Sequence, residues 1–145
     1  MRLSNEWFTA LSESESGELV TVIGRDALGE FIESGKFKER VEITWKYEPD
    51  SKGMPSNVEG ERMETVQETL RKAMEKDKFS ILTGVYTGGG EKVWVFYTRT
   101  SRVFGEKLNE VLEPFELLPI SIYTEADSGW EEYKDMYEMK EWAVD

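Results

Sequence analysis

The feature that most constrains the fold is a hairpin pattern from Lys78 to Arg99, KFSILTGVYTGGGEKVWVFYTR. Two runs rich in β-branched and aromatic residues are joined by Gly88, Gly89 and Gly90, and glycine readily adopts the positive φ angles of tight hairpin turns. A phosphate-binding loop leads from a strand into a helix, whereas both flanks here are strand-like. The pattern therefore predicts a β-hairpin, and the other elements can be arranged around it.

A strand and a helix are predicted before this hairpin. Residues 40–48, RVEITWKYE, alternate between apolar and polar side chains, which indicates a strand buried on one face. Residues 56–77 predict a helix, because Ser56 and Glu59 have the spacing of a capping box and apolar residues follow at helical intervals.

A second helix, beginning at Thr100 or Ser101, and a short strand at residues 119–124 are predicted after the hairpin. The order from residue 40 to residue 124 is then β-α-β-β-α-β. This order is typical of an α+β, ferredoxin-like core, in which two helices lie on one face of an antiparallel sheet.

The two ends of the chain predict additions to this core. Residues 6–25 predict a hairpin that either extends the sheet or covers its open face, and a short helical turn capped by Asp26 follows and stops at Gly35. A final helix is expected from Asp127 or Ser128. We expect one domain, residues 1–145, made of an N-terminal hairpin extension (1–39), the ferredoxin-like core (40–124) and an acidic C-terminal helix (125–145).

The composition narrows the chemistry. The chain contains no histidine and no cysteine, which excludes histidine acid–base catalysis, thiolate nucleophiles and zinc sites with His or Cys ligands, and no cofactor is predicted. The net charge is −12, of which residues 1–35 contribute −5 and residues 125–145 contribute −6. Such a surface repels phosphate backbones, so direct nucleic-acid binding is disfavoured and a basic protein partner is compatible.

Nothing in the sequence indicates a membrane protein or an exported one. No run of apolar residues is long enough to span a bilayer, and the first residues, MRLSNEWF, lack the apolar core of a signal peptide. We therefore expect a cytoplasmic protein that does not bind membranes.

An anion site is one candidate at the start of the second helix. Arg99, Thr100, Ser101 and Arg102 would combine two guanidinium groups with the free N–H groups of a helix N-terminus, which together suit a phosphate or carboxylate. The alternative is an ordinary capped helix whose arginines pair with nearby glutamates.

A metal site is a second candidate, in the C-terminal segment. Asp127, Glu131 and Asp135 are spaced four residues apart, so a helix would place their carboxylates on one face, and hard cations prefer such oxygens. The alternative is a solvated acidic helix face. A catalytic pair of carboxylates also stays open, because no motif selects one pair from 30 acidic residues.

Aromatic residues are a third candidate, as anchors for a partner protein. Trp94 and Phe96 share one face of their predicted strand, and Trp130 and Tyr133 share one side of the last helix. RNA stacking is disfavoured because the chain is acidic. The alternative for each residue is the hydrophobic core, and the aromatic side of the last helix favours packing of that helix onto the domain.

Four segments carry a family resemblance: RVEITWKYE, GMPS, ILTGVYTGGGEKVWVFYT and LPISIYTEADSGWEEY. From Arg40 to Tyr133 the chain resembles the bacterial domain-of-unknown-function family six-nine-five. The most specific part of the resemblance is VWVFYT combined with a later Trp-x-x-Tyr, here Trp130 and Tyr133. The family has no established activity, so no catalytic residue follows from the likeness. Some members resemble relatives of the acidic, ferredoxin-like regulator that inhibits ribonuclease E by binding it, which implies a protein-binding role by analogy.

We therefore predict a non-catalytic cytoplasmic module that regulates or binds another protein. The competing hypothesis is an enzyme or small-ligand binder that uses carboxylates together with Arg99 and Arg102. A third hypothesis is a homo-oligomer formed by pairing of exposed sheet edges.

Overall fold

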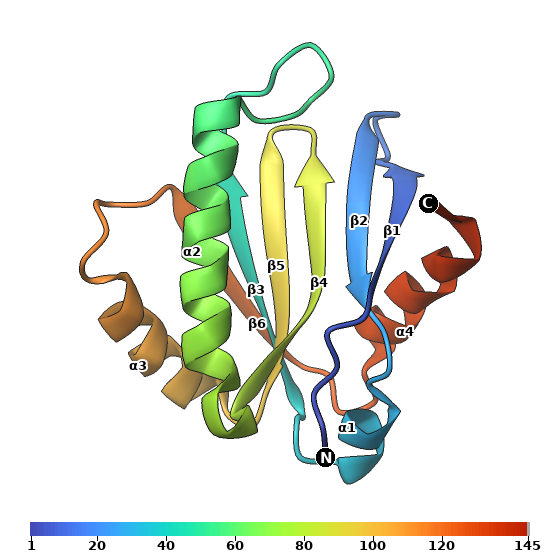
Figure 1. Cartoon of the computed structure of the whole chain (residues 1–145), viewed down its shortest axis with the longest axis vertical. Helices are drawn as coiled ribbons and strands as arrows, with labels where there is room; N and C mark the ends of the chain where they lie inside the picture. The colour runs from blue at the N-terminus through green and yellow to red at the C-terminus, as the bar shows by residue number, and fades with distance from the viewer. Residues whose placement is uncertain (145) are drawn as a thin grey trace.

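Figure 1 shows the computed structural model of the chain, which describes residues 1–144. Its centre is a seven-stranded antiparallel sheet in the spatial order β6-β3-β5-β4-β2-β1-β7. The strands are β1 Trp7–Glu13, β2 Leu19–Arg25, β3 Glu39–Lys46, β4 Ser80–Gly88, β5 Glu91–Thr98, β6 Ile120–Ala126 and β7 Ala143–Val144. The helices are α1 Gly29–Ser34, α2 Asn57–Glu75, α3 Ser101–Leu112 and α4 Glu131–Tyr137, with 3-10 turns η1 Lys76–Lys78 and η2 Glu138–Trp142.

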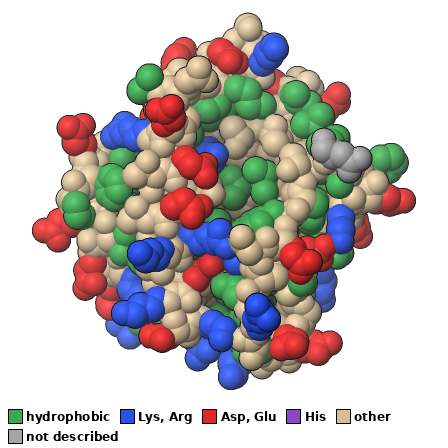
Figure 2. Space-filling view, viewed as in Figure 1, with side chains coloured by type: hydrophobic (Ala, Val, Ile, Leu, Met, Phe, Trp, Pro, Cys, Tyr) green, Lys and Arg blue, Asp and Glu red, His purple; other side chains and the backbone are tan. Residues whose placement is uncertain are grey.

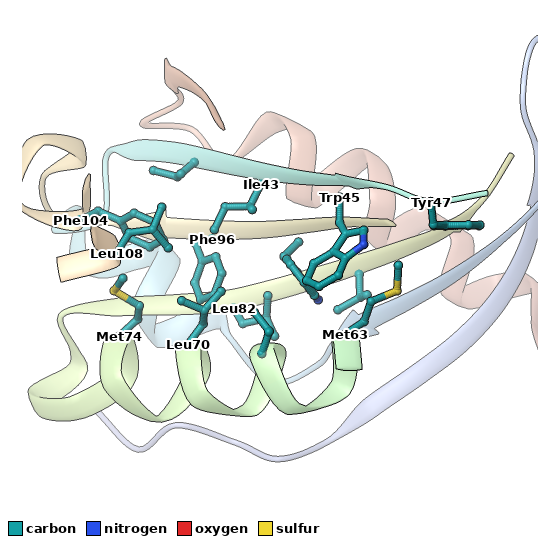
Figure 3. Close-up of a cluster of buried hydrophobic side chains, with 14 residues drawn as sticks. Ile43, Trp45, Tyr47, Met63, Leu70, Met74, Leu82, Phe96, Phe104 and Leu108 are labelled. Atoms are coloured by element: carbon teal, nitrogen blue, oxygen red, sulfur yellow. The ribbon is translucent and has the colours of Figure 1, made fainter. Parts of the chain in front are cut away.

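Helices α2 and α3 cover one face of the sheet over β3, β5 and β4 (Figure 1). Their apolar stripes meet the inward-facing residues of these strands, and Figure 3 shows the resulting core. The sheet contributes Ile43, Trp45 and Phe96, while Leu70 comes from α2 and Phe104 from α3. Val41, Ile43 and Trp45 alternate along β3 as the sequence pattern predicts, so the face of that strand under the helices is apolar from Val41 to Trp45.

The central hairpin has the predicted turn. Strands β4 and β5 pair in an antiparallel register that ends at Gly88 opposite Glu91. Gly89 and Gly90 have φ angles of 59° and 85°, which glycine adopts without the steric cost that a side chain would bring. The interpretation of the glycine triplet as a hairpin turn is confirmed.

The opposite face of the sheet is covered at one end by α1 and α4. Phe31 of α1 and Tyr133 and Met136 of α4 pack with Trp130 on apolar residues of β1, β2, β4 and β5. Near the other end of this face, Tyr86 and Val93 are only half-buried. The last helix therefore packs on the domain, and part of this face stays accessible.

The helices α2 and α3 leave β2 and β1 uncovered on their side (Figure 1). The same view in Figure 2 shows a hollow beside α2 with hydrophobic side chains on its floor. The guanidinium of Arg25 lies 4.8 Å and that of Arg71 5.2 Å from the ring centre of Trp7, at the start of β1. These two cation–π contacts fix the N-terminal strand against α2.

The α+β class is confirmed, and the N-terminal hairpin extends the sheet. The chain order from β3 to β6 is the predicted strand-helix-strand-strand-helix-strand order. The sheet nevertheless has seven strands, so the ferredoxin-like description, which implies four, is not confirmed. Asp26 does not cap α1, because that helix begins at Gly29 after an N-cap at Leu28. The final helix is shorter than predicted and ends at Tyr137.

Candidate functional site

Strand β6 forms one edge of the sheet and pairs only with β3 among the described residues. Its residues are mostly exposed, with 48% of Ile122 and 54% of Tyr123 accessible to solvent. Natural sheets normally protect an edge with charges, proline, a bulge or a covering segment, because unpaired N–H and C=O groups recruit further strands. This edge is seven residues long and contains only Glu125 as a charged residue.

The hydrogen-bonding pattern identifies which backbone groups of β6 are free to pair. The N–H of Asp127 donates to the carbonyl of Lys38 at 2.8 Å, and the register continues without a shift along β3. In an antiparallel ladder the bonded pairs alternate, so Tyr123 faces β3 with its backbone groups. The N–H and C=O groups of Ile122 and Thr124 consequently point away from the sheet.

An apolar groove lies beside this edge, between α3 and β6. It has a volume of about 480 Å³ and is lined mainly by leucines, isoleucines and Phe115. Leu117, in the loop that enters β6, is 99% exposed. Residues 117–124, LLPISIYT, form an uncharged run in a chain of which 33% is charged. The groove and the edge thus form one continuous surface, which we call the β6 surface and define as residues 117–124 together with the groove.

Acidic side chains surround the β6 surface. Between residues 106 and 126 the chain has five acids and one base. Glu113 and Glu116 line the groove itself, and Glu125 lies at the far end of the strand. On the α3 side of the molecule, Figure 2 shows acidic and hydrophobic side chains together with some basic ones.

A polar network ties β6 to β3 and to the start of α4. Arg40 is its centre, and its side chain is 12% exposed. Its guanidinium contacts Asp127 at 2.7 Å, Glu42 at 2.8 Å and Glu125 at 2.5 Å. Burial alone would lower the pKa of Arg40, but these hydrogen-bonded carboxylates raise it instead. The cation therefore persists at every physiological pH, and its single charge is shared among three carboxylates, one of which is Glu125 of β6.

Asp127 anchors the start of α4. Its carboxylate accepts hydrogen bonds from the hydroxyl of Tyr97 at 2.7 Å and from the backbone N–H groups of Glu131 at 2.9 Å and Glu132 at 3.3 Å. Burial would raise the pKa of Asp127, but the donors around it, Tyr97 first and Arg40 among them, lower it below its usual value. This carboxylate is therefore ionised and fully engaged inside the protein.

Trp130 and Tyr133 complete this junction. The ring of Trp130 stacks on Tyr97 at 4.1 Å between centroids, with 16° between the planes, and its indole N–H donates to the carbonyl of Phe37 at 2.9 Å. The hydroxyl of Tyr97 also accepts from the N–H of Tyr133 at 3.1 Å, and the hydroxyl of Tyr133 donates to the carbonyl of Arg25. Trp130 has a φ of 55°, so its backbone holds the turn that directs α4 onto the sheet.

The same residues explain the most specific part of the sequence pattern. VWVFYT supplies Tyr97, and Trp-x-x-Tyr supplies Trp130 and Tyr133, which pack against it. A family model described as a family of unknown function, DUF695, matches residues 8–137. The chain belongs to the DUF695 family. No curated protein and no solved structure matches the chain.

Glu132, on α4, has a carboxyl group whose pKa is strongly shifted. It accepts a hydrogen bond from the hydroxyl of Tyr86 at 3.1 Å, while its second oxygen is buried and has no hydrogen-bond partner among residues 1–144. Burial is the main cause that raises the pKa of Glu132 to about 7, and the nearby carboxylate of Glu42 acts in the same direction. This group therefore changes its charge near neutral pH.

At the anion site predicted at Arg99–Arg102, a carboxylate of the same chain binds the start of α3. The N–H of Ser101 donates to Glu39 at 2.8 Å, and its hydroxyl donates to the other oxygen of Glu39 at 3.2 Å. Thr100 is the N-cap residue of α3 but makes no capping bond with its side chain. The helix N-terminus does bind a carboxylate, but that carboxylate belongs to β3.

The two arginines of the predicted anion site point elsewhere. Arg99 lies over the ring of Phe37 at 5.4 Å, and Arg102 pairs with Glu106 at 3.0 Å along α3. The alternative interpretation, a helix whose arginine pairs with a nearby glutamate, describes Arg102. This geometry does not support a ligand held jointly by both arginines.

The metal site predicted at Asp127, Glu131 and Asp135 is not formed. The carboxylate of Asp127 is buried and accepts hydrogen bonds from groups of the protein, whereas Glu131 and Asp135 are exposed on α4. Within residues 1–144, no cluster of three or more acidic, histidine or cysteine side chains is placed to hold a metal ion. Helical spacing alone did not reveal that Asp127 precedes the helix and accepts hydrogen bonds from its first two N–H groups.

The predicted partner-binding aromatics lie in the interior. Trp94, Phe96, Trp130 and Tyr133 are between 1% and 3% exposed, so they contact the core rather than a partner. The prediction that they form an interaction surface is wrong for this fold. The core alternative holds, because α2 and α3 cover Trp94 and Phe96 and α4 carries Tyr133 onto the opposite face.

Sequence reasoning missed the residues that form the β6 surface and those that fill the predicted sites. A count of charge along the chain would have revealed residues 117–124 as the longest uncharged segment after the second helix. By contrast, no local signal indicated that Glu39 reaches α3 or that Tyr86 meets Glu132, because each contact joins distant elements.

Proposed function

We propose that this DUF695 chain is a cytoplasmic, non-catalytic protein-interaction module whose partner adds a strand to β6. The observation that carries the proposal is the exposed edge strand, uncharged up to Thr124, with an apolar groove beside it. Strand addition takes its affinity from main-chain hydrogen bonds and its specificity from pockets for alternate side chains, and the β6 surface offers both. Regulation would follow if the bound strand were needed elsewhere in the partner.

The arrangement of the sheet also supports an interaction role. We interpret β3 to β6 as a ferredoxin-like core. The N-terminal hairpin and the C-terminal segment are added to the β4 side of the sheet and to one of its faces, and they leave the outer edge of β6 unpaired among the described residues. Along residues 1–144, no helix has the length and apolar character needed to cross a bilayer. The competing hypothesis is an enzyme or small-ligand binder that uses carboxylates together with Arg99 and Arg102. The contacts of Arg99 with Phe37 and of Arg102 with Glu106 do not support the part of it that rests on the two arginines.

The test uses a photo-activated cross-linking residue placed at position 123 of the full chain in its native cells. We expect one discrete adduct with another protein, because Tyr123 is exposed at the middle of the edge. The same cross-linker at position 58 on α2, where Val58 is also exposed, is the matched control and should give no such adduct.

A backbone variant then tests whether strand pairing causes the adduct. Thr124→Pro removes an outward N–H and leaves the ladder with β3 intact, since proline is tolerated on an edge strand whose N–H faces solvent. Thr124→Ala keeps that N–H and serves as its control. Loss of the adduct in Thr124→Pro alone supports the proposal. Equal adducts in both variants, or none in the unaltered chain, would overturn it.

A further inference from the structure

The charges around the β6 surface specify the chemistry of the strand that it binds. We infer that the partner segment is an extended strand with alternating apolar residues, flanked on both sides by lysine or arginine. This inference rests on the proposed function, because it presumes that a strand pairs with β6. Beyond strand pairing, it specifies the sign of the charges that flank the partner strand and the sheet face on which the apolar side chains of that strand lie.

The apolar side of the partner strand follows from the two faces of β6. Ile120 and Ile122 point to the same face as the groove under α3, and both line it. Ser121, Tyr123 and Glu125 point to the other face, where Glu125 is held by Arg40. A strand added beside β6 continues this alternation, so its apolar side chains lie on the α3 side and its polar ones opposite.

The flanking charge follows from the acids at both ends of the uncharged run. Glu113 and Glu116 precede it and are exposed, and Glu125 follows it with half of its side chain exposed. Arg40 pairs with Glu125 but also with two other carboxylates, so its charge is shared among three acids. Cationic residues on the partner would therefore meet unneutralised acids at the groove end of the edge, which favours association and suppresses acidic partners.

A second copy of this chain fits the β6 surface poorly. Antiparallel pairing of two β6 strands would bring Glu113 and Glu116 of each copy toward the Glu125 end of the other. The two chains together would also carry a charge of −24, twice the −12 of one chain. Acids would thus oppose acids at both ends of the contact, so the surface disfavours self-pairing and accepts a basic strand.

The experiment measures binding of two labelled peptides, KKVTVTVKK and EEVTVTVEE, to the full chain by fluorescence anisotropy. We expect the basic peptide to bind at least about tenfold more tightly than the acidic one, and the difference to shrink at high salt. A third peptide, the basic one with N-methyl groups on its pairing edge, removes the main-chain donors without altering the protein. We expect this peptide not to bind. Because it is tested against the unaltered chain, its result does not depend on whether the Thr124→Pro variant folds.

Matched variants of the chain locate the charge effect. Glu113→Gln with Glu116→Gln should weaken the basic peptide by about threefold to tenfold, as expected for two exposed ion pairs. Glu61→Gln with Glu68→Gln changes the same net charge on exposed positions of α2 and should leave binding unchanged. An equal loss in both double variants would overturn the inference, because the effect would then come from net charge alone.

The outcomes separate the inference from the proposed function. Equal binding of both charged peptides, abolished by N-methylation, would overturn the flanking-charge inference and leave strand addition standing. Binding of neither peptide, or binding that survives N-methylation, would also overturn the inference, and the proposed function would then be decided by cross-linking at position 123. Formation of a dimer of this chain in sedimentation would overturn both the inference and the choice of partner.

Discussion

Glu132→Gln should make the protein more stable at neutral and alkaline pH. The unaltered carboxyl group has its pKa raised from 4.5 to about 7 in the folded state, chiefly by burial. Between these two values the folded state binds a proton that the unfolded state has released, so stability falls as the pH rises. A shift from 4.5 to about 7, at 1.36 kcal/mol per unit, corresponds to a loss of about 3 kcal/mol above neutrality.

The glutamine variant removes this ionisation and keeps the acceptor for the hydroxyl of Tyr86, which lies 3.1 Å from the carboxylate. We expect the free energy of unfolding to match that of the unaltered chain at about pH 4, below the pKa of the unfolded state, and to exceed it by about 1–3 kcal/mol at about pH 8. Urea denaturation followed by tryptophan fluorescence measures both. Glu131→Gln is the control, because Glu131 is exposed on the same helix.

The reasoning would be refuted if Glu132→Gln and Glu131→Gln had the same stability near about pH 8. It would also fail if the difference between Glu132→Gln and the unaltered chain did not grow with pH. Since the rest of the chain is common to both proteins, its large negative charge cancels from that difference.

Two further substitutions test the packing that leaves β6 as the free edge. Tyr97→Phe should lower stability by about 1–3 kcal/mol, because it removes one donor to the buried Asp127 and the side-chain acceptor of the N–H of Tyr133. Removal of the exposed hydroxyl in Tyr123→Phe should cost about 0.5 kcal/mol or less, and thermal unfolding compares the two variants. Arg25→Met should cost about 3–5 kcal/mol, because the buried carboxylate of Glu75 loses its 2.7 Å partner and keeps only the 3.2 Å ion pair with Arg71; addition of Glu75→Gln should recover part of that loss in urea denaturation. A smaller loss in Tyr97→Phe than in Tyr123→Phe, or no recovery in the double variant, would contradict these assignments.

Local sequence patterns predicted the elements in which the spacing of side chains reflects burial or helix capping. The alternation in RVEITWKYE predicted the buried face of β3, because a strand with one covered face imposes a period of two on its side chains. Ser56 accepts a hydrogen bond from the N–H of Glu59 at 3.2 Å, as the capping spacing indicated. Each of these features depends on residues close in sequence.

Features that depend on distant contacts were not predictable from the sequence. Trp130 looked like a surface anchor, but a φ of 55° and a bond to Phe37 turn it into the interior. Asp127 looked like a metal ligand, but Tyr97 and Arg40 fill its oxygens. The sites failed for the same physical reason, since a polar group buried by folding is satisfied by whichever partner the tertiary structure brings near.

The edge itself was open to prediction in part. The strand at residues 119–124 was expected, but nothing in one strand tells whether a neighbour lies on one side or on both. The order of strands decides this, because β1 and β2 joined the β4 side of the sheet and left β6 at the other edge. β7 also escaped prediction, because it is a pair of residues whose strand geometry comes from contact with β1.

The most direct test of the central claim is the hydrogen exchange rate of individual backbone amides in β6, measured by NMR on the isolated chain. The account predicts slow exchange for the N–H of Tyr123, which faces β3, and fast exchange for those of Ile122 and Thr124, which face solvent. Addition of the basic peptide should slow these two amides. Slow exchange at Ile122 and Thr124 in the isolated chain would contradict the account, because the edge would then already be covered.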